Sequence, residues 1–276
     1  MSQEDRARAF RALHAREGLF VMPNPWDLGT ARFLEALGFE AIATASAALA
    51  FSLARADGAG EVSRDEALAH GRTLADAVAV PVNGDLEDGF GDSPEAVAET
   101  IRGAIAAGLA GCSIEDTTGD PAQPLYEHGH AVERIRAAVE ARDAAGGDFV
   151  LTARCEAFLT GHPEALKVCV ERLQAMAEAG ADVVYACGMW QRDDIATLVR
   201  EVPRPVNVIG GTGPEPLPVA ELVSLGVKRV SLGPRLIQAA LGGFQRAAEE
   251  LRKEGSFGFM KEAAQLGPLT KMVRRD

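Results

Sequence analysis

The sequence has few aromatic residues, few cysteines and no excess of positive charge, and these shortages disfavour several classes of protein. Of its 276 residues 5% are aromatic, and 28 Lys and Arg stand against 40 Asp and Glu, which gives a net charge of -12. Sequence-independent binding to nucleic acid or to an anionic membrane needs a basic surface, so neither partner is expected. We expect a protein that handles small molecules.

The cysteines form no CxxC pair and stand alone at Cys112, Cys155, Cys169 and Cys187. This spacing predicts reduced, mostly buried thiols rather than a zinc site or a disulfide framework. The sequence also lacks an apolar run near the roughly 20 residues that a membrane helix needs, and residues 1–18 read as a charged helix rather than a signal peptide. We therefore predict a cytoplasmic protein.

Short apolar stretches alternate with helical patterns along the whole chain. Eight strands separated by helices predict a single (β/α)₈ barrel domain over residues 1–276, because helices must cover an all-parallel sheet. An open doubly wound sheet is the alternative, but it needs a glycine-rich turn after the first strand, where the sequence has Pro23-Asn24-Pro25. The predicted strands are Leu19–Met22, Ala41–Thr44, a stretch from Val80 into Asp85, Cys112–Ile114, Phe149–Ala153, Val183–Ala186, Pro205–Ile209 and Arg229–Leu232.

Capping signals mark the start of two helices, and two long loops lack such signals. Ser63-Arg64-Asp65-Glu66 predicts a helix that runs to about Ala79, and Ser93-Pro94 predicts a helix that ends near Gly108. Residues 45–60, which contain Asp57, and residues 117–127 are predicted as loops. Long loops inside compact domains are often functional.

Carboxylates follow several predicted strands, and in a barrel these strand ends share one rim. Such a group, without a His or Cys pair beside it, suits Mg²⁺ or Mn²⁺. An arginine among the acids would supply a planar cation for a substrate carboxylate, which points to a 2-oxo or 2-hydroxy acid. Asp85 and Glu87 lie two residues apart and face one side. The predicted site comprises Asp57, Asp85, Glu87, Glu115, Arg154 and Glu156.

The same residues allow a structural interpretation. A strand can end in Asp or Glu to cap the following helix, and Arg154 can pair with Glu115 or Glu156 to neutralise a buried acid. For Asp88, Asp116 and Glu156 taken singly, the sequence favours neither interpretation.

Four short motifs occur in the order and spacing of a known superfamily. They are similar to its D-x-D-x-G-[YF]-G, its I-E-D, its R-T-D-A, and its T-S-G with a downstream Asp. Together they resemble the isocitrate lyase/phosphoenolpyruvate mutase superfamily from Gly18 to about Gly255, near its phosphonomutase-like and 2-methylisocitrate lyase-like members. In this sequence the motifs are residues 85–91, Ser113–Asp116, Ala153–Ala157, and Thr44-Ala45-Ser46 with Asp57.

The resemblance implies a Mg²⁺-dependent barrel enzyme that makes or breaks C–C or P–C bonds beside the carbonyl of small 2-oxo or 2-hydroxy acids. It implies that Asp85 binds Mg²⁺ directly while Asp57, Glu87 and Glu115 hold its water shell. The expected catalytic residues are Arg154, Glu115 and Ser46, and the expected substrate-binding residues are Thr44, Ala45, Ser46, Arg154 and Asn207.

In several superfamily members the last helix swaps onto a neighbouring subunit. Residues 234–276 therefore predict a homotetramer built as a dimer of dimers. The amphipathic tail could equally form a local lid over its own barrel.

The loop after the fourth strand departs from the superfamily. The lyases carry K-[KR]-C-G-H there and the mutases carry Lys and Asn, whereas residues 117–126 contain neither Lys nor Cys, and Cys112 precedes the motif. Tyr126, His128 and His130 follow, but a histidine at a helix start more often serves as a capping or surface residue. We predict C–C cleavage or decarboxylation through an enolpyruvate-type intermediate. P–C chemistry, as in phosphoenolpyruvate mutase or phosphonopyruvate hydrolase, and a non-catalytic barrel that binds oxo acids are the alternatives.

Overall fold

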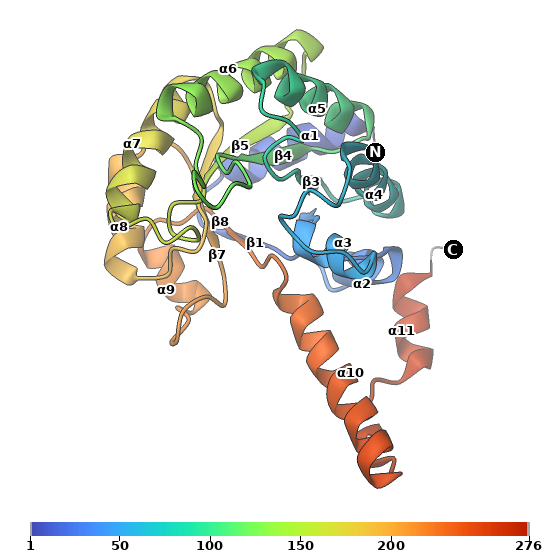
Figure 1. Ribbon diagram of the computed structural model, residues 1–276. Coiled ribbons are helices and arrows are strands. Elements are labelled where there is room, and N and C mark those ends of the chain that lie inside the picture. The colour runs from blue at the N-terminus through green and yellow to red at the C-terminus, as the bar shows by residue number, and fades with distance from the viewer. Residues whose placement is uncertain (1, 275–276) are drawn as a thin grey trace.

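A near-closed barrel of eight parallel strands forms the centre of the molecule (Figure 1). The computed structural model describes residues 2–274. The strand order is β1-β8-β7-β6-β5-β4-β3-β2, and the Ala43 amide donates to the Pro23 carbonyl at 3.0 Å between the ends of β1 and β2. The barrel prediction is confirmed. The strands are β1 Phe20–Met22, β2 Ile42–Ala43, β3 Val82–Asp85, β4 Gly111–Glu115, β5 Val150–Cys155, β6 Val183–Ala186, β7 Val206–Ile209 and β8 Arg229–Ser231.

Helices surround this barrel, and the two for which the sequence carries capping signals begin at those signals. The Ser63 hydroxyl accepts from the Glu66 amide while the Glu66 carboxylate accepts from the Ser63 amide, and Pro94 stands first in the helix after the Ser93 cap. The helices are α1 Gln3–Ala15, α2 Leu28–Ala36, α3 Ser46–Ser52, α4 Arg64–Ala77, α5 Pro94–Ala106, α6 His128–Ala145, α7 Ala165–Glu178, α8 Arg192–Glu201, α9 Val219–Ser224, α10 Arg235–Glu254 and α11 Leu266–Val273, with a 3₁₀ turn η1 Gly258–Lys261.

Two local predictions were wrong in detail. Residues 45–60 are not wholly a loop, because α3 occupies their first half. Its N-cap is Ala45, which makes no side-chain capping bond, so the sequence carries no capping signal that predicts this helix. Strand β5 runs to Cys155 rather than to Ala153, and this places Arg154 inside the strand.

The amino-terminal ends of the strands, which we call the bottom of the barrel, are closed by α1. The Phe10 ring lies edge-on to His14, with centroids 4.7 Å apart, and both rings also contact Phe20. The carboxyl ends of the strands form the opposite side, which we call the mouth. The four cysteines are buried and unpaired, as the sequence predicts.

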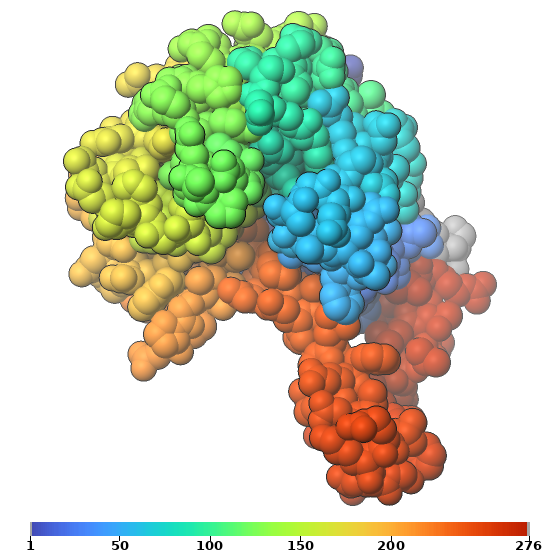
Figure 2. Space-filling view, viewed as in Figure 1, coloured from blue at the N-terminus to red at the C-terminus, as the bar shows by residue number. Residues whose placement is uncertain are grey.

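A helical arm leaves the barrel at its C-terminal end (Figures 1 and 2). Helix α10 projects away from the strands, and α11 returns to α2, where an Arg32 Nη donates to the Val273 carbonyl at 3.3 Å. Large apolar side chains are exposed along this arm, including Phe244 at 72% and Leu266 at 79%. Within residues 2–274, no helix combines the length and the hydropathy that crossing a bilayer demands.

Candidate active site at the barrel mouth

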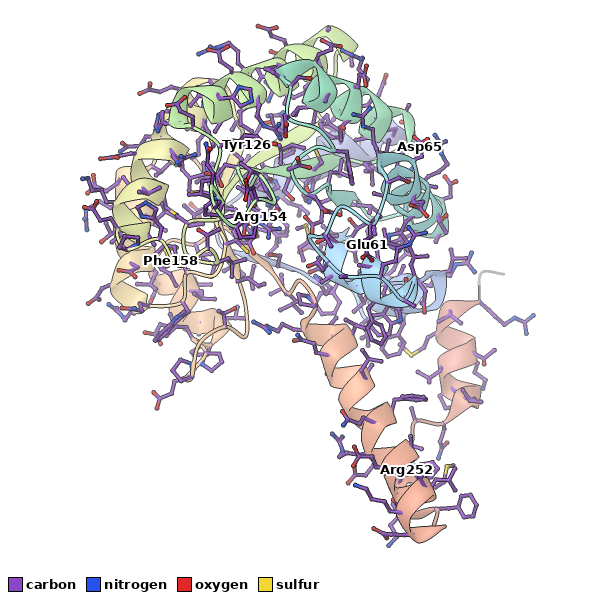
Figure 3. All side chains as sticks on the ribbon, in the orientation of Figure 1. Glu61, Asp65, Tyr126, Arg154, Phe158 and Arg252 are labelled. Atoms are coloured by element: carbon purple, nitrogen blue, oxygen red, sulfur yellow. The ribbon has the colours of Figure 1, made fainter. Side chains whose placement is uncertain are left out.

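Arg154 lies at the mouth of the barrel (Figure 3), where three carboxylates contact its guanidinium. Its Nη1 lies 2.8 Å from a Glu115 carboxylate oxygen and 3.3 Å from an Asp85 oxygen, and its Nε donates to Glu156. The parallel register of β4 and β5 sets Glu115 directly beside Arg154. Arg154 therefore pairs with both Glu115 and Glu156, as the structural interpretation of the sequence expects. Asp85 adds a third acid to the same cation.

Asp85 is held by the segment that follows β2. Its backbone amide donates to the Thr44 hydroxyl at 2.7 Å, and its carboxylate accepts from the Ser46 amide at 3.0 Å. The Ser46 side chain in turn hydrogen-bonds Asp57. Thr44 and Ser46 of the T-S-G-like motif therefore contact Asp85, and Asp57 joins them through Ser46. Asp85 is the residue that the resemblance implies as the direct Mg²⁺ ligand.

Glu87 completes the cluster from a tight turn. Its φ of +47° lies in the left-handed region, and its carbonyl accepts from the Glu115 amide at 2.9 Å. Burial, followed by the charges of Asp85 and Asp57, raises the pKa of Glu87 to about 7. Burial also raises the pKa of Glu115 well above its ordinary value, with Arg154 opposing and Glu156 adding to the shift. The cluster is short of positive charge.

Two adjoining cavities open at this cluster. The acidic cavity, of about 300 Å³, reaches from Glu87 and Glu115 to the loop residues Thr117–Gly119. The second cavity, of about 210 Å³, reaches from Asp85 to Tyr185 and to the loops after β7 and β8. Both share Ser46, Asp57, Arg154 and Leu159. Figure 2 shows the hollow between the segments near residues 50–60 and 117–125. A larger groove, of about 540 Å³, lies on the arm between α10 and η1 and contains none of the predicted site residues.

The donor chemistry of the cluster fits a hydrated Mg²⁺ rather than an ion enclosed by protein ligands. No three His, Cys, Asp or Glu side chains among residues 2–274 form a ready ligand set. Mg²⁺ usually keeps several waters and takes only one or two carboxylates directly. The two Asp85 carboxylate oxygens contact the Ser46 amide and Arg154, and three further acids line the adjoining acidic cavity: Asp57, Glu87 and Glu115.

Asn207 lies apart from both cavities. Its side chain is fully buried, with its amide nitrogen donating to the Ser231 hydroxyl at 3.0 Å and its oxygen accepting from Arg229 at 2.8 Å. The structure places this residue in the barrel interior below the mouth, whereas the resemblance implies a substrate-binding residue. A strand's residue pattern shows which side chains face inward but not how deep they lie.

Asp116 and Asp88, whose roles the sequence left open, shape the backbone. Asp116 is buried, accepts from the Glu156 amide at 2.8 Å and pairs with Arg172 at 3.1 Å. Asp88 borders the acidic cavity, and one of its oxygens accepts from the Phe90 amide at 2.8 Å within the Gly-Phe-Gly turn. Asp116 therefore orients Glu156 from behind.

The loop after β4 supplies no acid–base group to either cavity. It closes on itself through an antiparallel bridge between Thr117 and Leu125. The Tyr126 hydroxyl donates to Asp92 at 2.7 Å, and a His130 ring nitrogen lies 2.8 Å from the Asp92 carbonyl. Tyr126, His128 and His130 line neither cavity.

Comparisons with known proteins agree with this geometry. The sequence model of the family described as phosphoenolpyruvate phosphomutase matches residues 10–252. The chain belongs to this family. A solved lyase/mutase candidate from Burkholderia cenocepacia J2315 superposes on this phosphomutase-family barrel with a TM-score of 0.94, at 49% identity over 98% of this chain and 95% of its own.

Two further relatives of this phosphomutase-family chain are lyases. The 2-methylisocitrate lyase of Escherichia coli K12 is 31% identical over 191 residues, which cover 67% of this chain and 63% of the relative. A solved 2,3-dimethylmalate lyase of the PEP mutase/isocitrate lyase superfamily has a TM-score of 0.85 and 27% identity, covering 97% of this chain and 94% of its own.

The second cavity of this phosphomutase-family chain is also lined by Leu159, Tyr185 and Cys187, which are not among the predicted site residues. Arg235 lines it too and follows β8 in the segment Gly233-Pro234-Arg235, at a strand end where many barrels hold phosphate. Tyr185 stands beside Arg154 in the β5–β6 register, and its hydroxyl accepts from the Cys187 thiol at 3.0 Å. Because Tyr185 lies in a predicted strand beside the strand of Arg154, register could have indicated it. Nothing in the local sequence indicated Leu159.

Proposed function

We propose that this protein is a Mg²⁺-dependent lyase that acts on a small 2-oxo or 2-hydroxy acid through an enolpyruvate-type intermediate. The observation that carries the proposal is the cluster at the mouth, in which Asp85, Glu115 and Glu156 surround Arg154 and two further acids stand close by. An excess of buried carboxylates around one cavity suits a divalent cation. Membership of a phosphomutase family and the two lyase relatives support the same chemistry.

Each residue of the cluster has a role in this proposal. Asp85 would hold Mg²⁺ directly, and Asp57, Glu87 and Glu115 would hold it through water. When bound, the ion supplies Lewis-acid stabilisation to the oxygen on which charge develops. The ion pairs of Arg154 involve Nε and Nη1, so Nη2 remains a donor for the substrate carboxylate. The Ser46 amide and side chain keep Asp85 and Asp57 in place.

The closed loop after β4 favours a reaction that needs little acid–base help. When a 2-oxo acid carries a second carboxylate on the carbon next to the carbonyl, loss of that carboxylate as CO₂ leaves the electron pair in an enolate and needs no base, whereas cleavage of a 2-hydroxy acid needs one. Since Tyr126, His128 and His130 lie outside both cavities, we place decarboxylation or a related C–C cleavage of a 2-oxo acid first. P–C chemistry and binding without turnover are the alternatives.

The test is pyruvate formation with Mg²⁺ from oxaloacetate, 2-methylisocitrate, 2,3-dimethylmalate and phosphonopyruvate. Asp85→Ala is the inactive variant, and Asp76→Asn, an exposed acid on α4, is the matched control. We expect one carboxylic acid to be consumed by the wild type and the control only. Rapid turnover of 2-methylisocitrate would overturn the preference for decarboxylation. Phosphorus NMR signals from phosphonopyruvate products would favour P–C chemistry, and Mg²⁺ binding with no turnover at all would favour a binding protein.

We also infer that the C-terminal arm packs on a second copy of the chain, within a dimer or a dimer of dimers. The exposed apolar side chains of Phe244, Leu251, Phe257 and Leu266 support this inference, because α10 leaves the barrel before it can bury them. Light scattering after size-exclusion chromatography tests it. Phe244→Glu combined with Leu251→Glu should lower the particle mass, whereas an arm that serves as a local lid would leave a monomer unchanged. A cytoplasmic location stays a prediction.

A further inference from the structure

The turn that follows β3 is hydrogen-bonded along its whole length by groups from other elements. Each carbonyl from Glu87 to Asp92 accepts from a donor outside the turn. The donors are the Glu115 amide for residue 87, Arg134 for residues 88, 91 and 92, the Thr100 hydroxyl for residue 89 and Arg64 for residue 90. They come from β4 and from helices α4, α5 and α6. The surrounding elements therefore fix the path of this turn, whereas a turn on the surface would leave most of its carbonyls to water.

The backbone conformation of this turn is one that residues other than glycine seldom adopt. Glu87 has a φ of +47° and Phe90 has a φ of +61°, so both lie in the left-handed region. Such residues stay in that region only where the surrounding structure holds them there. The backbone angles of Glu87 also set the direction of its side chain, which lines the acidic cavity. A turn released from its hydrogen bonds would therefore turn the Glu87 carboxylate away from the cavity.

Arg134, on α6, supplies more of these hydrogen bonds than any other residue. One Nη donates to the Gly91 carbonyl at 2.6 Å and to the Asp92 carbonyl at 2.8 Å, and the other donates to the Asp88 carbonyl. The side chain is 1% exposed, and its guanidinium carbon lies 4.0 Å from the centre of the Tyr126 ring. The Asp88 carboxylate is 4.0 Å away, so backbone carbonyls are the principal partners of this cation. A single buried arginine therefore ties the start of the turn to its end.

We propose that Arg134 is a positioning residue for the metal site: it holds the turn after β3 so that Glu87 faces the ion at Asp85. This inference rests on the proposed function, in which Glu87 holds the water shell of Mg²⁺. Arg134 lines neither cavity, so it acts through Glu87 and not by contact with the ion or the substrate. Its positive charge opposes the binding of a cation, and its contribution is therefore one of geometry.

Calorimetric titration with Mg²⁺ alone, together with hydrogen exchange of the metal-free protein, tests this in Arg134→Gln and Arg134→Lys. Arg142→Gln is the matched control, because Arg142 lies on the same helix, is 11% exposed and donates to a backbone carbonyl at the bottom of the barrel, that of Gly180, at 3.1 Å. Thr100→Val removes the hydroxyl that donates to the Gly89 carbonyl at 2.6 Å, and Thr100→Ser keeps a hydroxyl. The Thr100 pair tests the same turn should Arg134→Gln fail to fold.

Arg134→Gln should weaken Mg²⁺ binding by about 10- to 100-fold, and the amides of residues 86–92 should exchange faster than in the wild type. Loss of a positive charge would by itself strengthen the binding of a cation, so weaker binding reports the displaced turn. Arg134→Lys, which keeps the charge but not the planar donors, should also bind Mg²⁺ more weakly than the wild type.

Thr100→Val should weaken Mg²⁺ binding by less than Arg134→Gln, because one carbonyl instead of three loses its donor, and Thr100→Ser should retain the wild-type affinity. Arg142→Gln should lower the free energy of unfolding in urea and leave the Mg²⁺ affinity unchanged. The control therefore separates a general loss of stability from a displaced turn.

The failures of the two proposals are distinguishable. If Arg134→Gln and Thr100→Val bind Mg²⁺ as the wild type does, or if Arg142→Gln weakens binding as much as Arg134→Gln, the positioning role is wrong and the proposed function stands. Weaker binding with unchanged exchange of residues 86–92 would also overturn the role, because the turn would not carry the effect. If the wild type binds no Mg²⁺, the proposed function fails and this inference falls with it.

Discussion

Two arginines, one at each end of the barrel, are held by opposite kinds of partner. At the mouth, Arg154 contacts Asp85, Glu115 and Glu156, and the acids outnumber it. At the bottom, Arg229 is held by neutral partners only, from Asn207, Thr152 and His14. The same side chain therefore serves two purposes. Arg229, held by neutral dipoles, is a permanent part of the scaffold. The excess of carboxylates around Arg154 leaves a site whose charge repulsion a bound cation would reduce.

The bottom arginine is complete without a ligand. Its Nε donates to the Asn207 oxygen at 2.8 Å, one Nη donates to the Thr152 hydroxyl at 3.0 Å and the other lies 3.3 Å from a His14 ring nitrogen. Burial lowers the pKa of Arg229 to about 9, which still leaves it charged at neutral pH. Its charge also lies 6.0 Å from the centre of the Phe10 ring. No anion is needed there, and neither cavity reaches it.

The strongest test of the mouth is Asp85→Asn. The substitution should abolish Mg²⁺ binding at micromolar to millimolar concentrations and lower turnover by about 10³-fold or more, because the proposed direct ligand loses its charge. The stability of the metal-free protein should stay the same or rise, since one of several repelling carboxylates has gone. Calorimetric Mg²⁺ titration and urea unfolding measure the two effects, with exposed Asp76→Asn as the control. Normal Mg²⁺ affinity in Asp85→Asn would remove Asp85 from the metal site.

Arg154→Gln and Arg229→Gln separate the two ends by their response to Mg²⁺. Arg154→Gln leaves largely buried acids without their cation and should lower the free energy of unfolding by about 3–5 kcal/mol. Arg229→Gln leaves neutral partners without a donor and should lower it by about 1–3 kcal/mol. Mg²⁺ should raise the unfolding free energy of Arg154→Gln by more than it raises that of the wild type, because the ion replaces the lost positive charge. It should raise the unfolding free energy of Arg229→Gln only by as much as that of the wild type. Urea unfolding with EDTA or with Mg²⁺ makes the comparison, and equal responses of the two variants would contradict it.

The sequence predicted the mouth far better than the bottom. Asp85, Glu87 and Glu115 lie in short motifs at strand ends, and Asp57 lies on the segment that follows β2. The barrel topology brings strand ends to one rim whatever the details of packing. The register of β4 and β5 could then have placed Glu115 beside Arg154. Local sequence and barrel topology together therefore predict that acids at strand ends gather at the mouth.

The remaining features depend on depth and on contacts between distant segments. Asn207 lies in a predicted strand, yet only its bonds to Arg229 and Ser231 show that it belongs to the interior. The His14 ring lies 3.3 Å from the Arg229 side chain although the two residues are 215 positions apart in the sequence. No local pattern encodes such meetings, because they arise only when the barrel closes.

The pH dependence of stability should distinguish the bottom from the mouth through His14. Burial, with the nearby charge of Arg229, lowers the pKa of His14 from 6.5 to about 3. Below pH 6.5 the unfolded chain takes up a proton that the native state refuses, so stability falls as the pH falls toward 3, by at most about 1.4 kcal/mol per pH unit.

His14→Gln, which cannot titrate, should lack this component. The difference in unfolding free energy between the wild type and His14→Gln should shift by about 2 kcal/mol in favour of the variant between pH 7.5 and pH 5. Chemical unfolding at several pH values in EDTA measures it. A constant difference across this range would show that His14 is protonated equally in both states.

The smallest expected effect concerns the outer acid of the mouth. Asp57 hydrogen-bonds the Ser46 side chain, and burial, then the charge of Asp85, raises its pKa. If it holds the ion through water, Asp57→Asn should weaken Mg²⁺ binding by about 10-fold, far less than Asp85→Asn, because an amide still accepts hydrogen bonds from a bound water. Asp65→Asn, an exposed acid at the start of α4 (Figure 3), is the control. A loss as large as that of Asp85→Asn would make Asp57 a direct ligand, and no loss would remove it from the water shell; either result would require the acids of the mouth to be assigned anew.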